Sequence, residues 1–121
     1  MAQWKDEYFW ETAVALNRRL AAREFSAVDA ARAFCRRMEK LGPRYQALTL
    51  SLQDDALHQA KDADRLFKRA RNRGPLQGVP CGVSDLLSVA RRPTTWGSSL
   101  FAGQVFQDDA NAVERLRKAG A

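Results

Sequence analysis

Residues 74–87 of this chain read GPLQGVPCGVSDLL, and residues 93–98 read PTTWGS. The run from Val79 to Val83 is short, apolar and bounded by glycine and proline, which is the pattern of a buried strand. Residues 85–103 are rich in turn-forming residues and predict a long loop after that strand. Functional side chains often lie on loops that a rigid element positions. The segment around Ser84 is therefore the first candidate site.

Both stretches resemble the lysine-bearing segment of the amidase signature family, whose pattern is close to G-P-L-x-G-[IV]-P-x-x-[IV]-K-D followed by P-T-T-x-G-S. Residues 41–48 (LGPRYQAL) are similar to that family's L-N-P-x-L-N-A link, and residues 108–121 are similar to its D-A-x-x-[IV]-x-R-L-[RK]-x-A-G-A helix. The resemblance extends over nearly all residues from about Leu16 onward. It implies a carbon–nitrogen hydrolase that cleaves amide bonds. It also implies the N-terminal portion of an α/β fold, in which amphipathic helices pack on the first strands of a mixed sheet.

The same resemblance implies a serine nucleophile, a second serine that relays protons, and a lysine base. A serine hydroxyl needs a neighbouring group to remove its proton, and a buried lysine can do so because desolvation lowers its pKa. In this chain Ser84 occupies the lysine position, and a hydroxyl cannot act as a base near neutral pH. The family's Gly/Ser-rich signature, which holds the two serines, is absent from the 121 residues. We therefore expect a truncated fold, a non-functional Ser84 and no amidase activity from this polypeptide alone.

Other interpretations of the segment find little support in the residues. Ser84 as a nucleophile would need a base and a G-x-S-x-G context, and residues 81–85 read CGVSD. Gly97-Ser98-Ser99 follows PTTW and is interpreted as a turn, not as the serine signature. Gly78 and Gly82 lack phosphate-loop spacing. Asp85 matches the residue that follows the family's lysine, and we expect it to make structural hydrogen bonds.

Apolar spacing along the chain predicts alternating helices and strands. A first helix is expected from about Trp4 to Ala22, and a second from Ser26, with Asp29 in its first turn, to a stop at Gly42-Pro43. The remaining elements are a strand at residues 47–52, a helix from Asp54, the strand at residues 79–83 and a helix from Asp108. This order indicates an α/β layer structure. We expect one partial domain, with a helical pair in residues 1–45 and the start of the α/β core in residues 46–121.

Composition is that of a globular protein, with 45% hydrophobic and 28% charged residues. The net charge is +6, and arginine outnumbers lysine fifteen to five. Such a balance is compatible with nucleic-acid binding. Because the basic residues are spread over several helices and no nucleic-acid-binding motif accompanies them, solvated helix faces are the favoured interpretation. A basic helical nucleic-acid binder remains the weakest of three hypotheses.

The chain contains one histidine, His58, and two cysteines, Cys35 and Cys81, that are far apart in sequence. No metal site can be assembled from these residues, and no cofactor motif is found. With no secretory signal and no apolar run approaching 18 residues, we expect reduced thiols and a cytoplasmic protein without a membrane span.

Four aromatic residues gather near the N-terminus: Trp4, Tyr8, Phe9 and Trp10. The simplest interpretation is that they pack against another part of the fold. The alternatives are contact with a membrane interface or with a protein partner. A non-enzymatic partner-binding module derived from an amidase, docking through these residues, is the second hypothesis for the chain.

Overall fold

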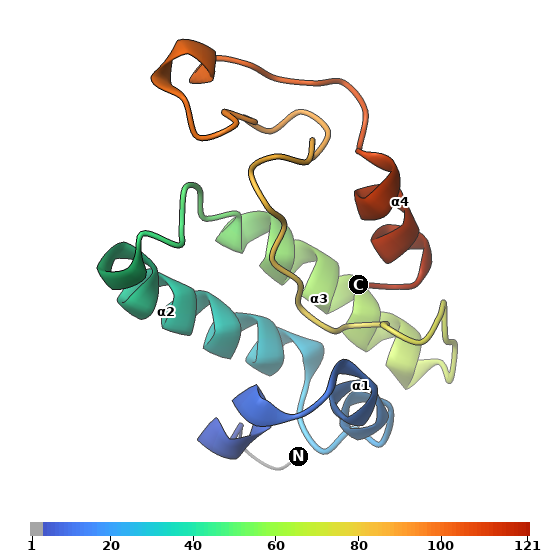
Figure 1. The fold of residues 1–121 in the computed structure, drawn as a ribbon. Coiled ribbons are helices and arrows are strands. Elements are labelled where there is room, and N and C mark those ends of the chain that lie inside the picture. The colour runs from blue at the N-terminus through green and yellow to red at the C-terminus, as the bar shows by residue number, and fades with distance from the viewer. Residues whose placement is uncertain (1–3) are drawn as a thin grey trace.

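The computed structural model describes residues 4–121 and shows a helical molecule (Figure 1). Its elements in chain order are the 3-10 helix η1 (Asp6–Trp10), α1 (Ala13–Ala21), α2 (Ala27–Tyr45), α3 (Gln53–Lys68), the 3-10 helix η2 (Ser99–Phe101) and α4 (Asn111–Lys118). Within residues 4–121 the only β-type pairing is an isolated antiparallel bridge between Pro93 and Val105.

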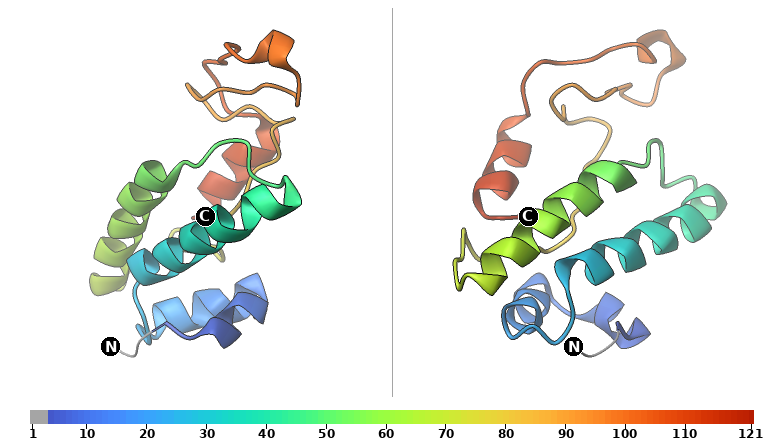
Figure 2. Two further views of the ribbon diagram at one scale, coloured as in Figure 1. Left: turned by 90° about the vertical axis from the view of Figure 1, so that its left-hand side faces the viewer. Right: turned by 180° about the vertical axis from the view of Figure 1, so that it is seen from behind.

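The helices form layers, with α2 and α3 side by side in the middle of the molecule (Figures 1 and 2). The η1 and α1 elements lie on one side of this pair, and the long loop of residues 84–110 rises from the other side. The C-terminal helix α4 returns beside α3. The core is formed mainly by α1, α2 and α3, and its most deeply buried large side chains are Leu20 and Phe25. Alanines at positions 27, 30, 31, 60 and 63 complete it, and their small side chains let the helices approach closely.

The beginning of α2 is capped from two directions. The Ser26 hydroxyl accepts the amide of Asp29 at 3.0 Å, and the Asp29 carboxylate accepts the amide of Ser26 at 3.2 Å, which is a capping box. Asp64 of α3 accepts the amides of Ala27 at 2.7 Å and Val28 at 3.2 Å. The helix start predicted at Ser26 is confirmed. The contribution of Asp64 joins α3 to α2 through free amides that would otherwise lack a partner.

The predicted stop of the second helix at Gly42-Pro43 is wrong, because α2 continues to Tyr45. Pro43 lies in the last turn, where its missing amide removes a single helical hydrogen bond. The helix ends at Gln46, whose φ of 51° is left-handed, and the amide of Ala47 donates to the Gly42 carbonyl at 2.9 Å. Gly42 is instead needed for packing, since a Cβ there would lie 2.6 Å from Cβ of Leu48.

A continuous first helix from Trp4 to Ala22 is also wrong. The chain turns at Glu11 and Thr12, and the Thr12 hydroxyl caps α1 by accepting the amide of Ala15 at 3.1 Å. Such a local side-chain bond competes with continued helix. The turn lets the N-terminal aromatic residues fold back onto α2.

Neither of the two strands predicted at residues 47–52 and 79–83 forms within residues 4–121, so the mixed sheet is not confirmed. A strand requires a neighbour to accept and donate its backbone hydrogen bonds. Leu52 instead serves as the residue that precedes α3. The amide nitrogens of residues 81–83 make no hydrogen bond to any other part of residues 4–121. The alternating and apolar patterns are present, but their strand partners are not among the described residues.

The last helix begins three residues later than predicted, at Asn111. Asp109 does not start the helix, because its carboxylate accepts the backbone amide of Ala90 at 2.8 Å and pairs with Arg117 at 2.6 Å. The third helix begins at Gln53, one residue before the predicted start.

Candidate active-site segment

Ser84 lies at the start of a turn that leads away from the helices. Its carbonyl accepts the amide of Leu87 at 2.9 Å, and its hydroxyl accepts the amide of Leu86 at 3.4 Å. The residue is exposed. Within residues 4–121 no lysine, histidine or second serine forms a hydrogen bond with the Ser84 hydroxyl. Nothing in its surroundings would therefore activate this hydroxyl as a nucleophile.

Asp85 ties the Ser84 turn to the PTTWGS loop. One carboxylate oxygen accepts the amide of Thr95 at 2.8 Å, and the other accepts the Thr95 hydroxyl and, at 3.3 Å, the amide of Gly97. These donors stabilise the charged carboxylate, so the pKa of Asp85 is lowered, chiefly by the Thr95 hydroxyl and amide. The hydrogen-bonding role expected of Asp85 from the sequence is present.

The backbone of the PTTWGS loop turns sharply where it meets Asp85. Trp96 and Gly97 both have left-handed φ angles, of 52° and 71°, and the amide of Ser98 donates to the Thr95 carbonyl at 2.9 Å. This conformation directs the amides of Thr95 and Gly97 toward the same carboxylate. It confirms the interpretation of Gly97-Ser98-Ser99 as a turn.

The two arms of the long loop are held together as a small hairpin. The buried Thr94 donates its amide to the Gln104 carbonyl, and the Gln104 side-chain amide donates to the Thr94 carbonyl, both at 2.9 Å. At the tip, the ring of Trp96 lies 5.1 Å from that of Phe101 and 6.0 Å from that of Phe106. The loop therefore has a defined shape although it contains no regular strand.

Two contacts anchor the loop to the helices. Arg92 binds Asp55 of α3 through two parallel hydrogen bonds of 2.6 and 2.8 Å, and this guanidinium lowers the pKa of Asp55. The amide of Ala90 donates to Asp109 beside α4. The pKa of Asp109 is lowered, chiefly by the bond from Ala90.

The GPLQG part of the motif is fixed by a buried side chain, Gln77. Its side-chain amide donates to the Arg71 carbonyl at 3.1 Å, and its side-chain oxygen accepts the amide of Arg73 at 2.5 Å. Its own carbonyl accepts the side-chain amide of Asn17 in α1 at 2.9 Å. Gln77 occupies the variable position of the motif, and neither periodicity nor motif spacing in the sequence signals its role.

The end of α4 closes onto this same turn. The amides of Leu76 and Gly78 donate to the carbonyls of Ala119 and Gly120, each at 3.0 Å. A Cβ at Gly120 would lie 2.8 Å from the Cα of Gln77, and the φ of Gly120 is 98°, so only glycine fits without strain. The candidate segment is thus held between α1, α3 and α4.

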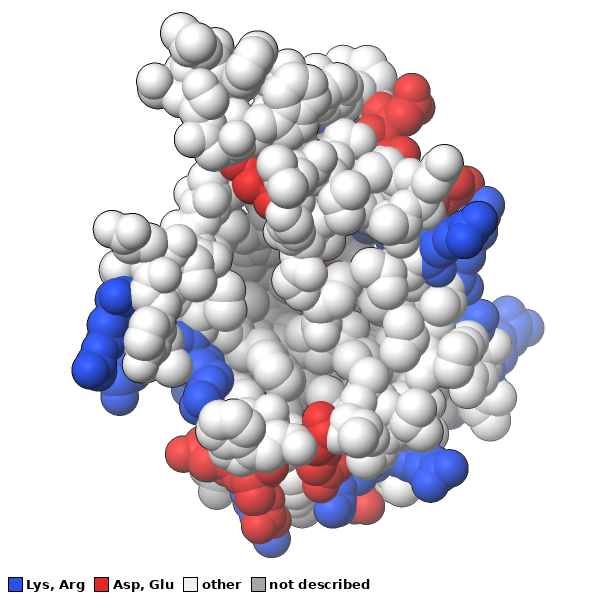
Figure 3. Space-filling model, viewed as in Figure 1, with Lys and Arg blue, Asp and Glu red and all other residues white. Residues whose placement is uncertain are grey.

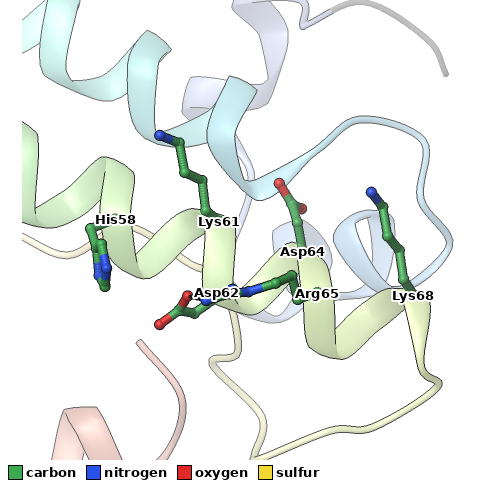
Figure 4. Close-up of a pocket in the computed structure, with 6 residues that line it drawn as sticks. All are labelled: His58, Lys61, Asp62, Asp64, Arg65 and Lys68. Carbon is green, nitrogen blue, oxygen red and sulfur yellow. Dashed lines mark hydrogen bonds and ion pairs between the residues drawn. The ribbon is translucent and has the colours of Figure 1, made fainter.

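The remaining sequence candidates lie elsewhere. His58 is exposed on α3, beside a shallow pocket of about 440 Å³ (Figure 4). Figure 4 shows Asp62 and Arg65 lying toward each other, while Asp64 points to the other side of the helix, toward α2. Within residues 4–121 no group of three or more histidine, cysteine, aspartate or glutamate residues could hold a metal ion. Over the same residues, no helix is both long and apolar enough to cross a membrane.

Most of the aromatic cluster faces inward. Tyr8 is buried and stacks on Phe25, with ring centres 4.9 Å apart. Trp4 and Phe9 contact Phe34 of α2 at 5.7 and 5.1 Å. Trp10 is 79% exposed. Packing within the chain therefore accounts for three of the four residues, and contact with a partner stays a prediction that only Trp10 presents freely.

Comparison with known proteins gives consistent matches. The family model described as Amidase matches residues 29–121. The chain is 33% identical over 115 residues to a protein of the glutamyl-tRNA(Gln) amidotransferase of Carboxydothermus hydrogenoformans, and the match covers 95% of this chain and 24% of that protein. It is 33% identical over 102 residues to the putative amidase AmiD of Mycobacterium tuberculosis, and that match covers 84% of this chain and 22% of that protein.

Solved structures show the same backbone. The peptide amidase of Stenotrophomonas maltophilia superimposes with a TM-score of 0.84 and 35% identity, over 94% of this chain and 24% of that chain. A peptide amidase bound to the competitive inhibitor chymostatin gives a TM-score of 0.85 and 34% identity, over 95% of this chain and 24% of that chain. The chain spans about a quarter of the length of the relatives it matches. Because the family model covers most of its residues, including the Ser84–Asp85 segment, the chain belongs to the amidase family.

Proposed function

We propose that this chain supplies the N-terminal helices and the lysine-position segment of an amidase-type carbon–nitrogen hydrolase fold. The observation that carries the proposal is the family match over residues 29–121, together with the hydrogen bonds that join Asp85 to Thr95 and Gly97. Those bonds hold the two most distinctive motif stretches in a single rigid unit. A small amide is the proposed substrate, bound only in a complete fold.

The proposal includes a mixed sheet. Residues 79–83 would form one of its strands once a neighbouring strand is present, since the amides of residues 81–83 have no hydrogen-bond partner within residues 4–121. Backbone groups buried without partners cost free energy, so a complete fold would pair them. The alternating residues 47–52 are the second proposed strand.

We further propose that Ser84 occupies the position of the family's lysine and that this polypeptide does not hydrolyse amides alone. A serine hydroxyl stays protonated near neutral pH and cannot accept the proton of a nucleophile. Removal of a positioned general base commonly lowers a rate by about 10² to 10⁴. In the structure, the hydroxyl of Ser84 only accepts a bond from its neighbour Leu86.

A chimera tests both parts of the proposal. Residues 1–121 replace the matched stretch of the S. maltophilia peptide amidase, in one form with Ser84 and in another with Ser84→Lys. We expect the Ser84→Lys chimera to hydrolyse the substrate of the intact peptide amidase about 10² to 10⁴ times faster than the Ser84 form.

Two results would contradict the proposal. Equal hydrolysis by both chimeras would show that residue 84 is not at the base position. A folded Ser84→Lys chimera without activity would show that this segment cannot complete an amidase site. Asp85→Asn in the active chimera is a further comparison, because it removes the link to Thr95 while leaving residue 84 unchanged.

A further inference from the structure

Exposed apolar side chains are concentrated in one part of the molecule. Of eleven large hydrophobic residues exposed within residues 4–121, six lie between residues 86 and 105. Leu100 is 88% exposed and Leu86 is 68% exposed. We call this set the apolar loop surface: Leu86, Leu87, Trp96, Leu100, Phe101 and Val105. Single exposed apolar residues are ordinary, but a dense group of them marks an interaction site.

This surface carries almost no charge. From Pro93 to Gln107 the chain contains no charged residue. Figure 3 shows the corresponding upper part of the molecule free of charged side chains, while lysines, arginines and most acidic residues gather around the helices. A solvated loop would be expected to contain polar and charged residues, so the composition favours burial against another surface.

The surface is also preformed. The contacts of Thr94 with Gln104, of Asp85 with Thr95, and of Trp96 with Phe101 fix the loop before anything covers it. A binding surface that is already ordered loses little conformational entropy when it docks. A loop of this length without regular structure is commonly a functional one.

The backbone beside this surface indicates the chemical nature of the partner. The amides of residues 81–83, which directly precede the Ser84 turn, have no hydrogen-bond partner within residues 4–121. Lipid cannot supply partners for such groups, whereas an added β-strand can. The partner that fits both features is therefore a polypeptide that brings a strand and an apolar surface.

We infer that the apolar loop surface, together with the backbone of residues 81–83, is the docking site for the polypeptide that completes an amidase-type fold. This inference rests on the proposed function. The peptide amidase with a TM-score of 0.85 shares its backbone with 95% of this chain, yet the match covers only 24% of that amidase. About three quarters of that chain lies outside the match and must pack against the matched part. An uncharged surface beside an unpaired backbone is the place in this chain that suits such packing.

Co-expression tests the inference in two separate chains. The 121-residue chain is produced together with a tagged polypeptide that contains the part of the S. maltophilia peptide amidase outside the matched stretch. We expect a soluble one-to-one complex. Leu100→Asp and Leu86→Asp should each weaken it at least about tenfold, because a carboxylate would be desolvated at the interface. Both side chains are largely exposed in the free chain, so its helical circular dichroism should not change.

Val14→Asp is the matched control, since Val14 is exposed on α1, on the other side of the molecule, and should leave the complex unaffected. Hydrogen exchange gives a second measurement that does not depend on the separate piece folding. In the covalent chimera, the amides of residues 81–83 and 96–105 should exchange at least about tenfold more slowly than in the free chain, while those of α1 change little.

Three results would overturn the inference: equally fast exchange of residues 81–83 and 96–105 in the chimera and the free chain, undiminished binding by Leu100→Asp, or a homodimer of this chain that Leu100→Asp disrupts. The proposed function fails separately. A protected surface in a chimera that stays inactive after Ser84→Lys would support docking and contradict the assignment of residue 84, whereas an active Ser84→Lys chimera with an unprotected surface would do the reverse.

Discussion

The carboxylate of Asp64 on α3 accepts the backbone amide of Ala27, the first residue of α2, at 2.7 Å. A residue 37 positions further along the chain thus supplies the cap that begins the central helix. The second carboxylate oxygen accepts the amide of Val28, and a negative charge at a helix N-terminus is favourable. The packing of α2 against α3 is therefore joined at one end by a directional polar contact.

Replacement of Asp64 by alanine should destabilise the chain by about 1–2 kcal/mol, which is the usual effect of losing an N-terminal cap. Ala27 is fully buried, so water cannot easily replace the lost acceptor. Asp64→Asn should be milder because the amide oxygen can still accept. Urea unfolding followed by circular dichroism measures these differences. Asp54→Asn, at an exposed position in the first turn of α3, is the control. An Asp64→Ala variant as stable as this control would contradict the capping role.

Protonation of Asp85 should release the PTTWGS loop at low pH. The folded-state pKa of Asp85 is lowered, so its stabilising contribution is complete above the unfolded value of about 3.9 and is lost as the pH falls through the folded value. The amide resonances of Thr95 and Gly97 should therefore shift together, with a midpoint below about 3.9. A pH titration by two-dimensional NMR checks this. In Asp85→Asn the acid-linked shift should disappear, and a midpoint above the unfolded value would disprove the interaction.

Substitution of Gln77 by leucine should cost about 1–3 kcal/mol, because the Arg71 carbonyl and the Arg73 amide would lose their partners in a partly buried turn. The size of the side chain changes little, so the effect isolates the polar contacts. Gln107→Leu, at an exposed position, provides the comparison. Thermal unfolding of the two variants measures the difference. Equal melting temperatures would show that Gln77 is not needed to hold the turn.

Gly120→Ala should loosen the contact between α4 and the GPLQG turn. Alanine is strained at a φ of 98°, and its Cβ would meet the Gln77 backbone at 2.8–2.9 Å. We expect a loss of stability above about 1 kcal/mol and faster hydrogen exchange at the amides of Leu76 and Gly78. Gly103→Ala is the matched control, because no atom lies within 4 Å of its added Cβ. Unchanged exchange at Leu76 and Gly78 in Gly120→Ala would contradict the required close approach.

Local signals in the sequence predict the structure correctly where the physical cause is itself local. The Ser26–Asp29 capping box spans four residues, and both reciprocal bonds form within that span. The turn at Gly97 likewise follows from residues beside it. The same local logic is wrong at Gly42-Pro43, because the close approach of Leu48, and not helix termination, determines why glycine is there.

By itself, the sequence determined the family, the position of the candidate segment and the helical character of most of the chain, since motif order and apolar periodicity are properties of neighbouring residues. Only the tertiary structure decided that Asp64 caps α2, that Gln77 is buried, and that residues 79–83 are left without a strand partner among the described residues. Each of these depends on atoms brought together across the chain, and a strand in particular exists only through the hydrogen bonds of its neighbour.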